Sequence, residues 1–239
     1  MPLELIKDWM KVEKVVQETP DTKTLRVQLK KPINFVPGQF VMVGLNLGEG
    51  NSQLVKRAFS IASSPLQKAC IDVTFNLYPD GKLSPYLYNL KEGDLVYIEG
   101  PYGKFNFNGN PQEDIVFLGA GTGLTPLMSM IRYMIDKKMD NKKTLIYSVK
   151  KPENIVYHQE LLEMEKSKSL RLFLTITRPD GTDWHGLTGR IDGEMIKECA
   201  PNFKNSVFYM CGPPEMVEGT VKILEDLGVP KERINREQW

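Results

Sequence analysis

A glycine-rich segment is the clearest place in this sequence where chemistry could occur. Gly119-Ala-Gly-Thr-Gly-Leu-Thr-Pro126 lies between an apolar run, Ile115–Leu118, and an amphipathic segment that starts at Leu127. Glycines let a backbone turn tightly and approach a ligand, and a helix N-terminus offers free N–H groups to a phosphate. The segment predicts a pyrophosphate site formed by Gly121, Thr122, Gly123 and Pro126. A plain glycine turn is the alternative.

This loop differs from the common dinucleotide-binding fingerprint. Pro126 stands near the place of the third glycine, and no acidic residue ends the next apolar run. That run, Leu145–Val149, leads into Lys150 and Lys151 instead. An acidic residue there would bind a ribose 2′-hydroxyl, whereas cations suit a 2′-phosphate. The pattern favours NADP over NAD, although solvated lysines are a simpler explanation.

Composition excludes several classes of protein. The chain has 239 residues, 41% of them apolar and 26% charged, and a formal net charge of +1. A nucleic-acid-binding protein usually shows a basic excess, and a membrane helix needs about 20 apolar residues in a row. Neither feature is present, and the N-terminus does not resemble a signal peptide. Cysteines and histidines are too scattered for a disulfide framework or a metal site, which predicts a cytoplasmic protein without metal (Cys70, Cys199, Cys211, His158, His185).

The elements that must position the loop differ between the two halves of the chain. In the first half, apolar and polar residues alternate along Leu25–Leu29 and Ile71–Leu77. Phe40–Val43 and Leu95–Ile98 are further strand candidates that follow turns. Period-two alternation predicts an antiparallel sheet or barrel with one face in the core and the other in water.

The second half contains continuous apolar runs with helical segments between them. The runs are Ile115–Leu118, Leu145–Tyr147, Leu172–Ile176 and Val207–Met210. Strands of this kind occur in parallel sheets covered by helices. The expected helices include one with Leu127, Met130, Ile131, Met134 and Ile135 on its apolar face, capped by Thr125, and others over 154–166 and 213–227. The sequence therefore predicts a β-barrel domain, 1–110, followed by a parallel α/β domain, 111–239.

Four short motifs, in order, give the sequence a resemblance to a known family. They are Arg57-Ala-Phe-Ser60, Gly81-Lys-Leu-Ser84, Gly119–Pro126 and Cys211-Gly-Pro-Pro214, and the C-terminal Ile234–Trp239 adds an acidic and aromatic ending. Together they resemble the signatures of the ferredoxin–NADP reductase superfamily over nearly the whole chain. The resemblance implies a β-barrel that binds FAD and an α/β domain that binds NADP or NAD.

The first two motifs are those that the resemblance assigns to FAD. Arg57 carries a planar charged fork suited to a pyrophosphate, but a solvated surface cation is the alternative. Phe59 would stack on the flavin ring or simply belong to the core, and Ser60 would hydrogen-bond a flavin nitrogen or serve a turn. The FAD-binding residues implied are Arg57, Ala58, Phe59, Ser60, Gly81, Lys82, Leu83 and Ser84.

The remaining motifs are those that the resemblance assigns to the nicotinamide nucleotide. Cys211, Gly212 and Pro213 would lie beside the nicotinamide ring, with Glu237 nearby and Trp239 covering the flavin. Each has a simpler alternative: a small buried cysteine, a solvated glutamate, and a tryptophan that packs the terminus. Lys150 and Arg178 would bind the 2′-phosphate. The residues implied to act at the reacting rings are Ser60, Cys211 and Glu237.

The function implied is hydride transfer from NAD(P)H to FAD and electron transfer to a separate acceptor. Three scattered cysteines cannot hold an iron–sulfur cluster, and the chain begins almost at the barrel. The acceptor is therefore expected to be another molecule, with a ferredoxin or flavodoxin as the leading candidate. Two alternatives stay open: an obligate electron-transfer subunit of a larger redox complex or oxygenase, and a flavin- or nucleotide-binding sensor.

Overall fold

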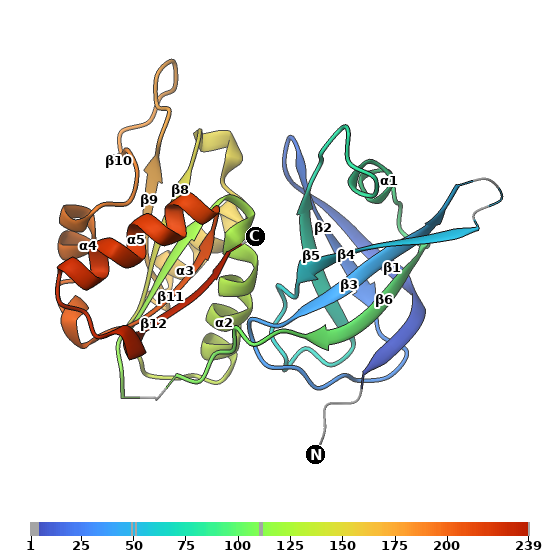
Figure 1. Ribbon diagram of the computed structural model, residues 1–239, viewed down its shortest axis with the longest axis horizontal. Coiled ribbons are helices and arrows are strands. Elements are labelled where there is room, and N and C mark those ends of the chain that lie inside the picture. Colours follow the sequence, from blue (N-terminus) through green and yellow to red (C-terminus); the bar gives the residue numbers. More distant parts are fainter. Residues whose placement is uncertain (1–4, 49, 51, 110–111, 239) are drawn as a thin grey trace. The chain divides into compact units, whose positions relative to one another are not determined.

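The computed structural model describes residues 5–48, 50, 52–109 and 112–238 (Figure 1). The chain divides into two compact units. We call Met1–Phe107 together with Met128–Asp136 the barrel unit, and Asn108–Leu127 together with Lys137–Trp239 the parallel-sheet unit. Helix α2 (Leu124–Asp136) contributes to both. No helix in the described ranges is long and apolar enough to cross a bilayer.

The barrel unit is built from one antiparallel sheet of six strands in the order β4-β3-β6-β1-β2-β5. Its elements are β1 (Ile6–Thr19), β2 (Thr22–Gln28), β3 (Phe40–Leu47), β4 (Gln53–Ser60), β5 (Cys70–Asn76), α1 (Ser84–Tyr88) and β6 (Leu95–Tyr102). In the part of the chain that is described, an isolated bridge between Ile61 and Val73 joins the β4 and β5 sides of the sheet. Within the described residues, no continuous ladder pairs these two edge strands.

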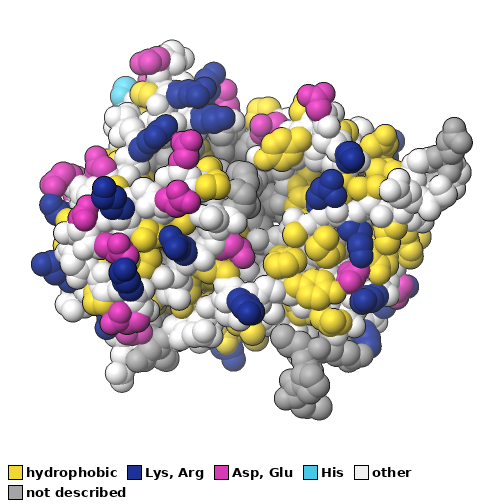
Figure 2. All heavy atoms as spheres, viewed as in Figure 1, with side chains coloured by type: hydrophobic (Ala, Val, Ile, Leu, Met, Phe, Trp, Pro, Cys, Tyr) yellow, Lys and Arg dark blue, Asp and Glu magenta, His cyan; other side chains and the backbone are white. Residues whose placement is uncertain are grey.

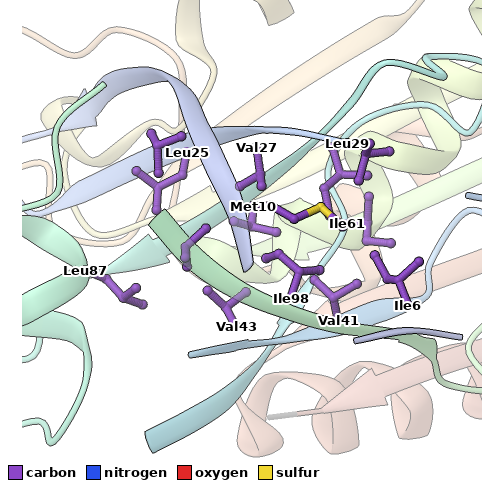
Figure 3. Packing of buried hydrophobic residues seen from close by; sticks show 14 of the residues in the cluster. Ile6, Met10, Leu25, Val27, Leu29, Val41, Val43, Ile61, Leu87 and Ile98 are labelled. Atoms are coloured by element: carbon purple, nitrogen blue, oxygen red, sulfur yellow. The ribbon is translucent and has the colours of Figure 1, made fainter. Parts of the chain in front are cut away.

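The apolar residues of the alternating segments form the core of this barrel. Leu25, Val27, Ile71, Val73 and Ile98 are fully buried, and Figure 3 shows several of them converging from different strands. Burying an aliphatic side chain of this size contributes roughly 1.5–3 kcal/mol. The predicted antiparallel barrel is confirmed by these strands.

The expectation that the second face of the alternating strands lies in water is wrong for Thr24 of β2 and for Asp72 and Thr74 of β5. Thr24 and Thr74 are buried and hydrogen-bonded to each other at 2.7 Å. Arg26 donates two hydrogen bonds, of 2.8 and 2.9 Å, to the buried Asp72 carboxylate. Direct pairing satisfies these polar groups, so they can be buried without a large penalty. The Asp72 carboxylate also raises the pKa of the Arg26 guanidinium.

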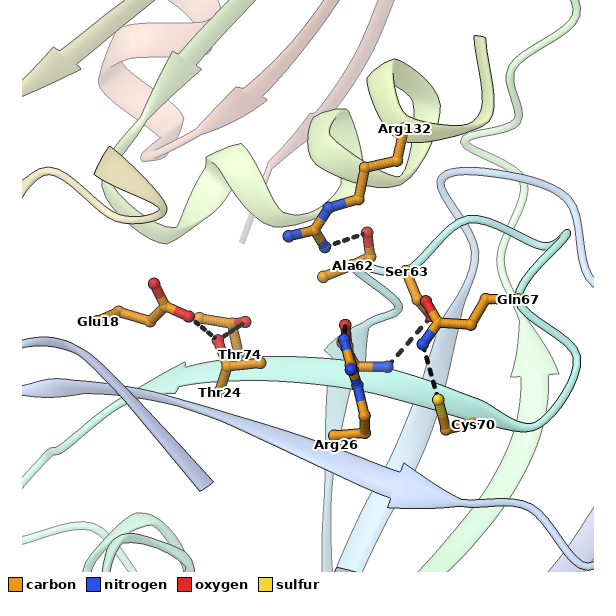
Figure 4. Close-up of polar contacts among 10 residues, drawn as sticks. Glu18, Thr24, Arg26, Ala62, Ser63, Gln67, Cys70, Thr74 and Arg132 are labelled. Carbon is orange, nitrogen blue, oxygen red and sulfur yellow. Dashed lines mark hydrogen bonds and ion pairs between the residues drawn. The ribbon is translucent and has the colours of Figure 1, made fainter. Parts of the chain in front are cut away.

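The second half of α2 packs against the barrel. The Ser129 hydroxyl donates to the carbonyl of Ser63 at 2.7 Å. Arg132 donates to the carbonyl of Ala62 at 2.8 Å, as Figure 4 shows. Met128 and Met130 are fully buried on the same half of the helix. Two backbone carbonyls just beyond β4 therefore obtain their partners from a helix that comes much later in the chain.

The parallel-sheet unit has a six-stranded sheet in the order β10-β9-β8-β7-β11-β12, in which every pairing is parallel. Its elements are β7 (Ile115–Ala120), β8 (Lys143–Val149), α3 (His158–Lys166), β9 (Arg171–Ile176), β10 (Leu187–Thr188), α4 (Gly193–Cys199), β11 (Val207–Gly212), α5 (Pro214–Asp226) and β12 (Ile234–Gln238). The predicted buried strands and the α5 helix are confirmed. The α3 helix is shorter than predicted because a 3₁₀ turn, Pro152–Asn154, precedes it.

Candidate functional site

Several of the candidate residues meet at one edge of the parallel sheet. Parallel strands end at the same edge, and ligands bind there in open α/β sheets. The glycine loop follows β7, whose Gly119 pairs with Cys211 near the end of β11. Cys211 pairs in turn with Glu237 of β12. The predicted residues of this unit that lie at or just beyond strand ends are Gly121, Thr122, Gly123, Pro126, Lys150, Arg178, Cys211, Gly212, Pro213 and Glu237.

Two glycines give the loop its shape. Gly121 adopts a φ of +54°, a left-handed conformation that favours glycine, and nothing lies within 4 Å of a Cβ placed there. Gly123 is in a normal conformation, but a Cβ on it would lie 2.7 Å from Cα of Gly212 and closer still to the carbonyl oxygen of Cys211. Gly121 therefore leaves open space beside the loop, while Gly123 lets the loop pack directly on β11.

The predicted cap of α2 is wrong. The helix begins at Leu124, directly after a 3₁₀ turn over Gly121–Gly123, so Thr125 lies inside its first turn. Within the described residues, Thr125 Oγ1 is buried and has no hydrogen-bond partner. A buried polar atom usually has a partner. An unpaired oxygen next to a glycine loop fits a site that receives a polar ligand such as a nucleotide.

Cys211 and Glu237 form a pair of protonatable groups on neighbouring strands. Burial and the neighbouring Glu237 carboxylate raise the pKa of the Cys211 thiol. Burial also raises the pKa of the half-buried Glu237 carboxyl. A thiol with a raised pKa stays protonated at neutral pH and is a poor nucleophile. Cys211 can therefore contribute shape and polarity to the site but not attack a substrate.

The two predicted phosphate-binding cations are neighbours. The backbone N–H of Arg178 donates to the carbonyl of Lys150 at 2.9 Å, just past the ends of β9 and β8. Both side chains are exposed. Figure 2 shows basic side chains gathered at the end of the parallel-sheet unit where β8 and β9 finish. Exposed cationic side chains at this position suit a phosphate group.

In the barrel unit, the first motif lies on the edge strand β4. Arg57 and Ala58 are exposed, and Arg57 donates a 2.8 Å hydrogen bond to the carbonyl of Lys56. Phe59 packs partly on the barrel core and contacts Phe75 edge-on, with 5.8 Å between ring centroids. The structure therefore gives Phe59 a core contact, while leaving it only half-buried.

The second motif forms the turn after β5. A Cβ on Gly81 would lie 2.9 Å from the carbonyl oxygen of Tyr78, so this turn needs glycine. The Ser84 hydroxyl donates to that same carbonyl and accepts from the Tyr78 N–H, both at 3.0 Å. Lys82 is exposed and Leu83 is buried in the core. The two motifs thus stand on β4 and after β5, the two edges between which the barrel seam is not closed by a ladder.

An ion pair between β4 and β6 was not predicted from the sequence. The Lys56 side chain crosses over Gly44 of β3 and pairs with Glu99 of β6 at 2.6 Å. Glu99 also accepts a 2.8 Å hydrogen bond from Tyr102, and these contacts lower the pKa of Glu99 to about 2. Nothing in the sequence links residues this far apart, because the contact depends on sheet order. Trp239, also among the predicted residues, lies outside the described part of the chain.

Comparison with known proteins agrees with these two units. The model described as "Oxidoreductase FAD-binding domain" matches residues 9–107, and "Oxidoreductase NAD-binding domain" matches residues 117–222. The glycine betaine monooxygenase reductase subunit of Pseudomonas aeruginosa is 32% identical over 231 residues, which are 95% of this chain. The match covers 62% of that relative, so this chain spans less than two thirds of its length.

Two further likenesses cover more of the compared protein. NADH-cytochrome b5 reductase 1 of Aspergillus terreus is 32% identical over 204 residues, covering 82% of this chain and 68% of that protein. The structure of a ferredoxin NADP⁺ reductase from Neisseria gonorrhoeae, with bound FAD and NADP, superposes with a TM-score of 0.80. It is 24% identical, covers 97% of this chain and 98% of that one, and shows the shared fold. The chain belongs to the ferredoxin–NADP reductase-like flavoprotein superfamily of oxidoreductases, with an FAD-binding domain followed by an NAD-binding domain.

Proposed function

We propose that this chain takes a hydride from NAD(P)H onto FAD and delivers electrons to a separate redox protein. The observation that carries the proposal is the presence, in one chain, of two motifs on the β4 and β5 edges of the barrel sheet and a glycine loop packed on Cys211. Bound FAD would accept two electrons together and release them singly. The protein's own residues then have to bind, orient and shield the reacting groups. We also propose that residues 1–110 and 111–239 divide the two binding tasks.

The flavin side of this proposal rests on four positions. Arg57 would neutralise the FAD pyrophosphate, because its guanidinium is exposed on the edge strand. Phe59 would offer its half-exposed face to the flavin ring, and Ser60 a hydroxyl to its polar edge. Backbone groups in the turn Gly81–Ser84 would approach the phosphates, since the Ser84 hydroxyl already serves the turn itself.

The nucleotide side rests on the sheet edge of the other unit. The glycine loop would receive the pyrophosphate, with Thr122 beside Gly121 and with Thr125 Oγ1 available as a polar partner. Cys211, Gly212 and Pro213 would bound the nicotinamide pocket and exclude water from it. The Glu237 carboxyl, whose pKa is raised by burial, would hydrogen-bond a carboxamide there.

We propose a small one-electron carrier protein, such as a ferredoxin or flavodoxin, as the acceptor. An oxygenase component is a second candidate, because the relative from Pseudomonas aeruginosa is named as the reductase subunit of a monooxygenase. In that case the chain would act as a subunit of a larger redox system.

The proposed function is tested on the purified chain under anaerobic conditions. We expect a yellow protein whose visible flavin band bleaches when NADH or NADPH is added, and whose colour returns with a one-electron oxidant. A colourless protein that takes up no FAD would contradict the flavin assignment. A flavin that neither nucleotide reduces would contradict the enzyme and favour a sensor. Full activity with a dye but none with ferredoxin or flavodoxin would favour a dedicated oxygenase partner.

Nucleotide choice gives a separate prediction. Arg178→Ala or Lys150→Ala is expected to raise KM for NADPH about ten-fold and leave KM for NADH nearly unchanged, because a charge-assisted hydrogen bond contributes roughly 1.5–3 kcal/mol. Steady-state kinetics with both donors provide the measurement. Arg171→Ala is the matched control, since Arg171 starts the same strand, β9, that Arg178 follows. Equal losses for both donors would remove the 2′-phosphate assignment.

A further inference from the structure

A buried tyrosine connects the glycine loop to the segment that follows β8. Tyr147 of β8 is fully buried and pairs in the sheet with Gly119, at the start of the loop. Its hydroxyl donates to the carbonyl oxygen of Gly121 at 3.0 Å. The same hydroxyl accepts from the backbone N–H of Val156 at 3.4 Å.

The two backbone groups that share this hydroxyl belong to the two halves of the proposed nucleotide site. Gly121 is the loop residue with positive φ and open space beside it. Val156 ends the stretch that runs from Lys150, and both Val156 and Ile155 are buried. Tyr157 follows in a left-handed conformation, with a φ of 55°, and directly precedes α3. The hydroxyl therefore links the glycine loop to the segment between β8 and α3. That segment is held in place at its end, where Ile155 and Val156 are buried.

Position in the sheet explains why one side chain can do this. A tyrosine near the carboxyl end of a central strand extends its hydroxyl to the height of the loops, while its ring stays in the core. Phenylalanine would fill the same volume but could not donate to the Gly121 carbonyl or accept from the Val156 N–H. Gly121 is half-buried, and its carbonyl also accepts from the N–H of Leu124 at the end of the 3₁₀ turn. Val156 is buried, so leaving its N–H without the hydroxyl would be costly.

We infer that Tyr147 is a positioning residue for nicotinamide-nucleotide binding, which sets the carbonyl of Gly121 and therefore the direction of the loop's N–H groups. The inference rests on the proposed function, because it assumes that the loop receives the nucleotide pyrophosphate. Tyr147 itself touches the loop and not the ligand. The hydroxyl orders both parts of the site before the nucleotide arrives, so its loss should weaken binding without changing the chemistry that follows.

Tyr147→Phe tests this inference. The dissociation constants of NADP⁺ and NAD⁺, measured by calorimetry on the FAD-loaded protein, are expected to rise about ten-fold, the usual effect of losing one such hydrogen bond. Both should rise, because both nucleotides carry a pyrophosphate. The rate at saturating NADPH and the flavin content should change little. Unchanged dissociation constants in a folded Tyr147→Phe protein would overturn the inference.

Tyr209→Phe is the matched control. Tyr209 is a buried tyrosine of β11 in the same sheet, and its hydroxyl accepts from the N–H of Asn108 at 3.2 Å. Tyr209→Phe should cost thermal stability but leave both dissociation constants unchanged. If both variants weaken binding equally, the effect is general destabilisation and the positioning role is refuted. If the wild-type protein binds neither nucleotide, the proposed function fails first.

A measurement on the wild-type protein covers the case in which Tyr147→Phe does not fold. Amide hydrogen exchange of the FAD-loaded protein is recorded with and without NADP⁺. Exchange at the Val156 N–H is expected to slow at least several-fold when nucleotide occupies the loop. Protection of the loop residues with no change at Val156 would overturn the inference.

Discussion

Replacing Arg57 with alanine is expected to yield a protein that purifies with little bound FAD. The guanidinium is exposed on the edge strand β4, beside the seam that no ladder closes. A hydrogen bond to a charged group contributes roughly 1.5–3 kcal/mol, which is about a ten- to hundred-fold change in the dissociation constant of FAD. The ratio of flavin to protein absorbance after gel filtration, followed by titration with FAD, measures the effect.

Two controls separate charge from geometry in this experiment. Lys68→Ala removes an exposed cation of the same unit that contacts Asn34 and lies outside both flavin motifs. It should keep its full FAD content. Arg57→Lys retains the charge but loses the planar fork, so it should recover only part of the affinity. An Arg57→Ala protein with wild-type flavin content and affinity would show that Arg57 is only a solvated cation.

Gly123→Ala is expected to damage nucleotide binding and stability together. The added methyl group would overlap backbone atoms of Cys211 and Gly212, which cannot rotate away as a side chain could. Overpacking of this kind typically costs about 1–3 kcal/mol of unfolding free energy. The loop or the end of β11 must move, so KM for the nucleotide should rise ten-fold or more. Chemical denaturation and steady-state kinetics measure the two effects.

Gly219→Ala provides the comparison for this substitution. Gly219 lies in α5 of the same unit, and nothing lies within 4 Å of a Cβ placed there. Alanine in a helix interior is favoured over glycine by roughly 0.5–1 kcal/mol, so this variant should be slightly more stable and fully active. If Gly123→Ala behaves like Gly219→Ala, close packing of the loop on β11 is unimportant for binding.

The period of the apolar residues predicted the two kinds of sheet, because core-facing side chains repeat every two residues on a half-buried strand. It did not predict β1, whose register shifts after Val12 and after Gln17 break the alternation. It also placed Thr24 and Thr74 in water, since alternation reports polarity and not pairing. Polar side chains that satisfy one another across two strands can be buried, and only the structure shows which ones do so.

Helix α2 also shows that the pattern of apolar residues does not predict which polar residues are buried. Four residues of its predicted apolar face, Leu127, Met130, Ile131 and Met134, are fully buried, and the fifth, Ile135, is half-buried. The structure also buries Ser129 on the other side of the helix. In an amphipathic helix pattern, a serine is assigned to the face that contacts solvent. Its burial results from a hydrogen bond to Ser63, which is a contact between segments far apart in the sequence.

The sequence predicted which residue types form the candidate site better than it predicted how they are held. The glycine loop and the motif at Cys211 were visible as strings, because close backbone approach demands glycine wherever it occurs. Tyr147 and Glu99 could not be identified in this way, because the sequence does not show which residue a buried tyrosine or a glutamate contacts. Their roles depend on which strands are neighbours.

The sharing of α2 bears on any attempt to recombine this protein with a relative. The nine residues Met128–Asp136 belong to the barrel unit but are encoded after the first strand of the other unit. A gene crossover in the linker around residues 108–114 would thus join this barrel to a foreign helix. The carbonyls of Ala62 and Ser63 would then depend on whatever residues the other parent supplies in place of Arg132 and Ser129. We expect chimeras to fold when Arg132 and Ser129 come from the same parent as the barrel strands, and to fail when these two residues come from the parent of the parallel sheet.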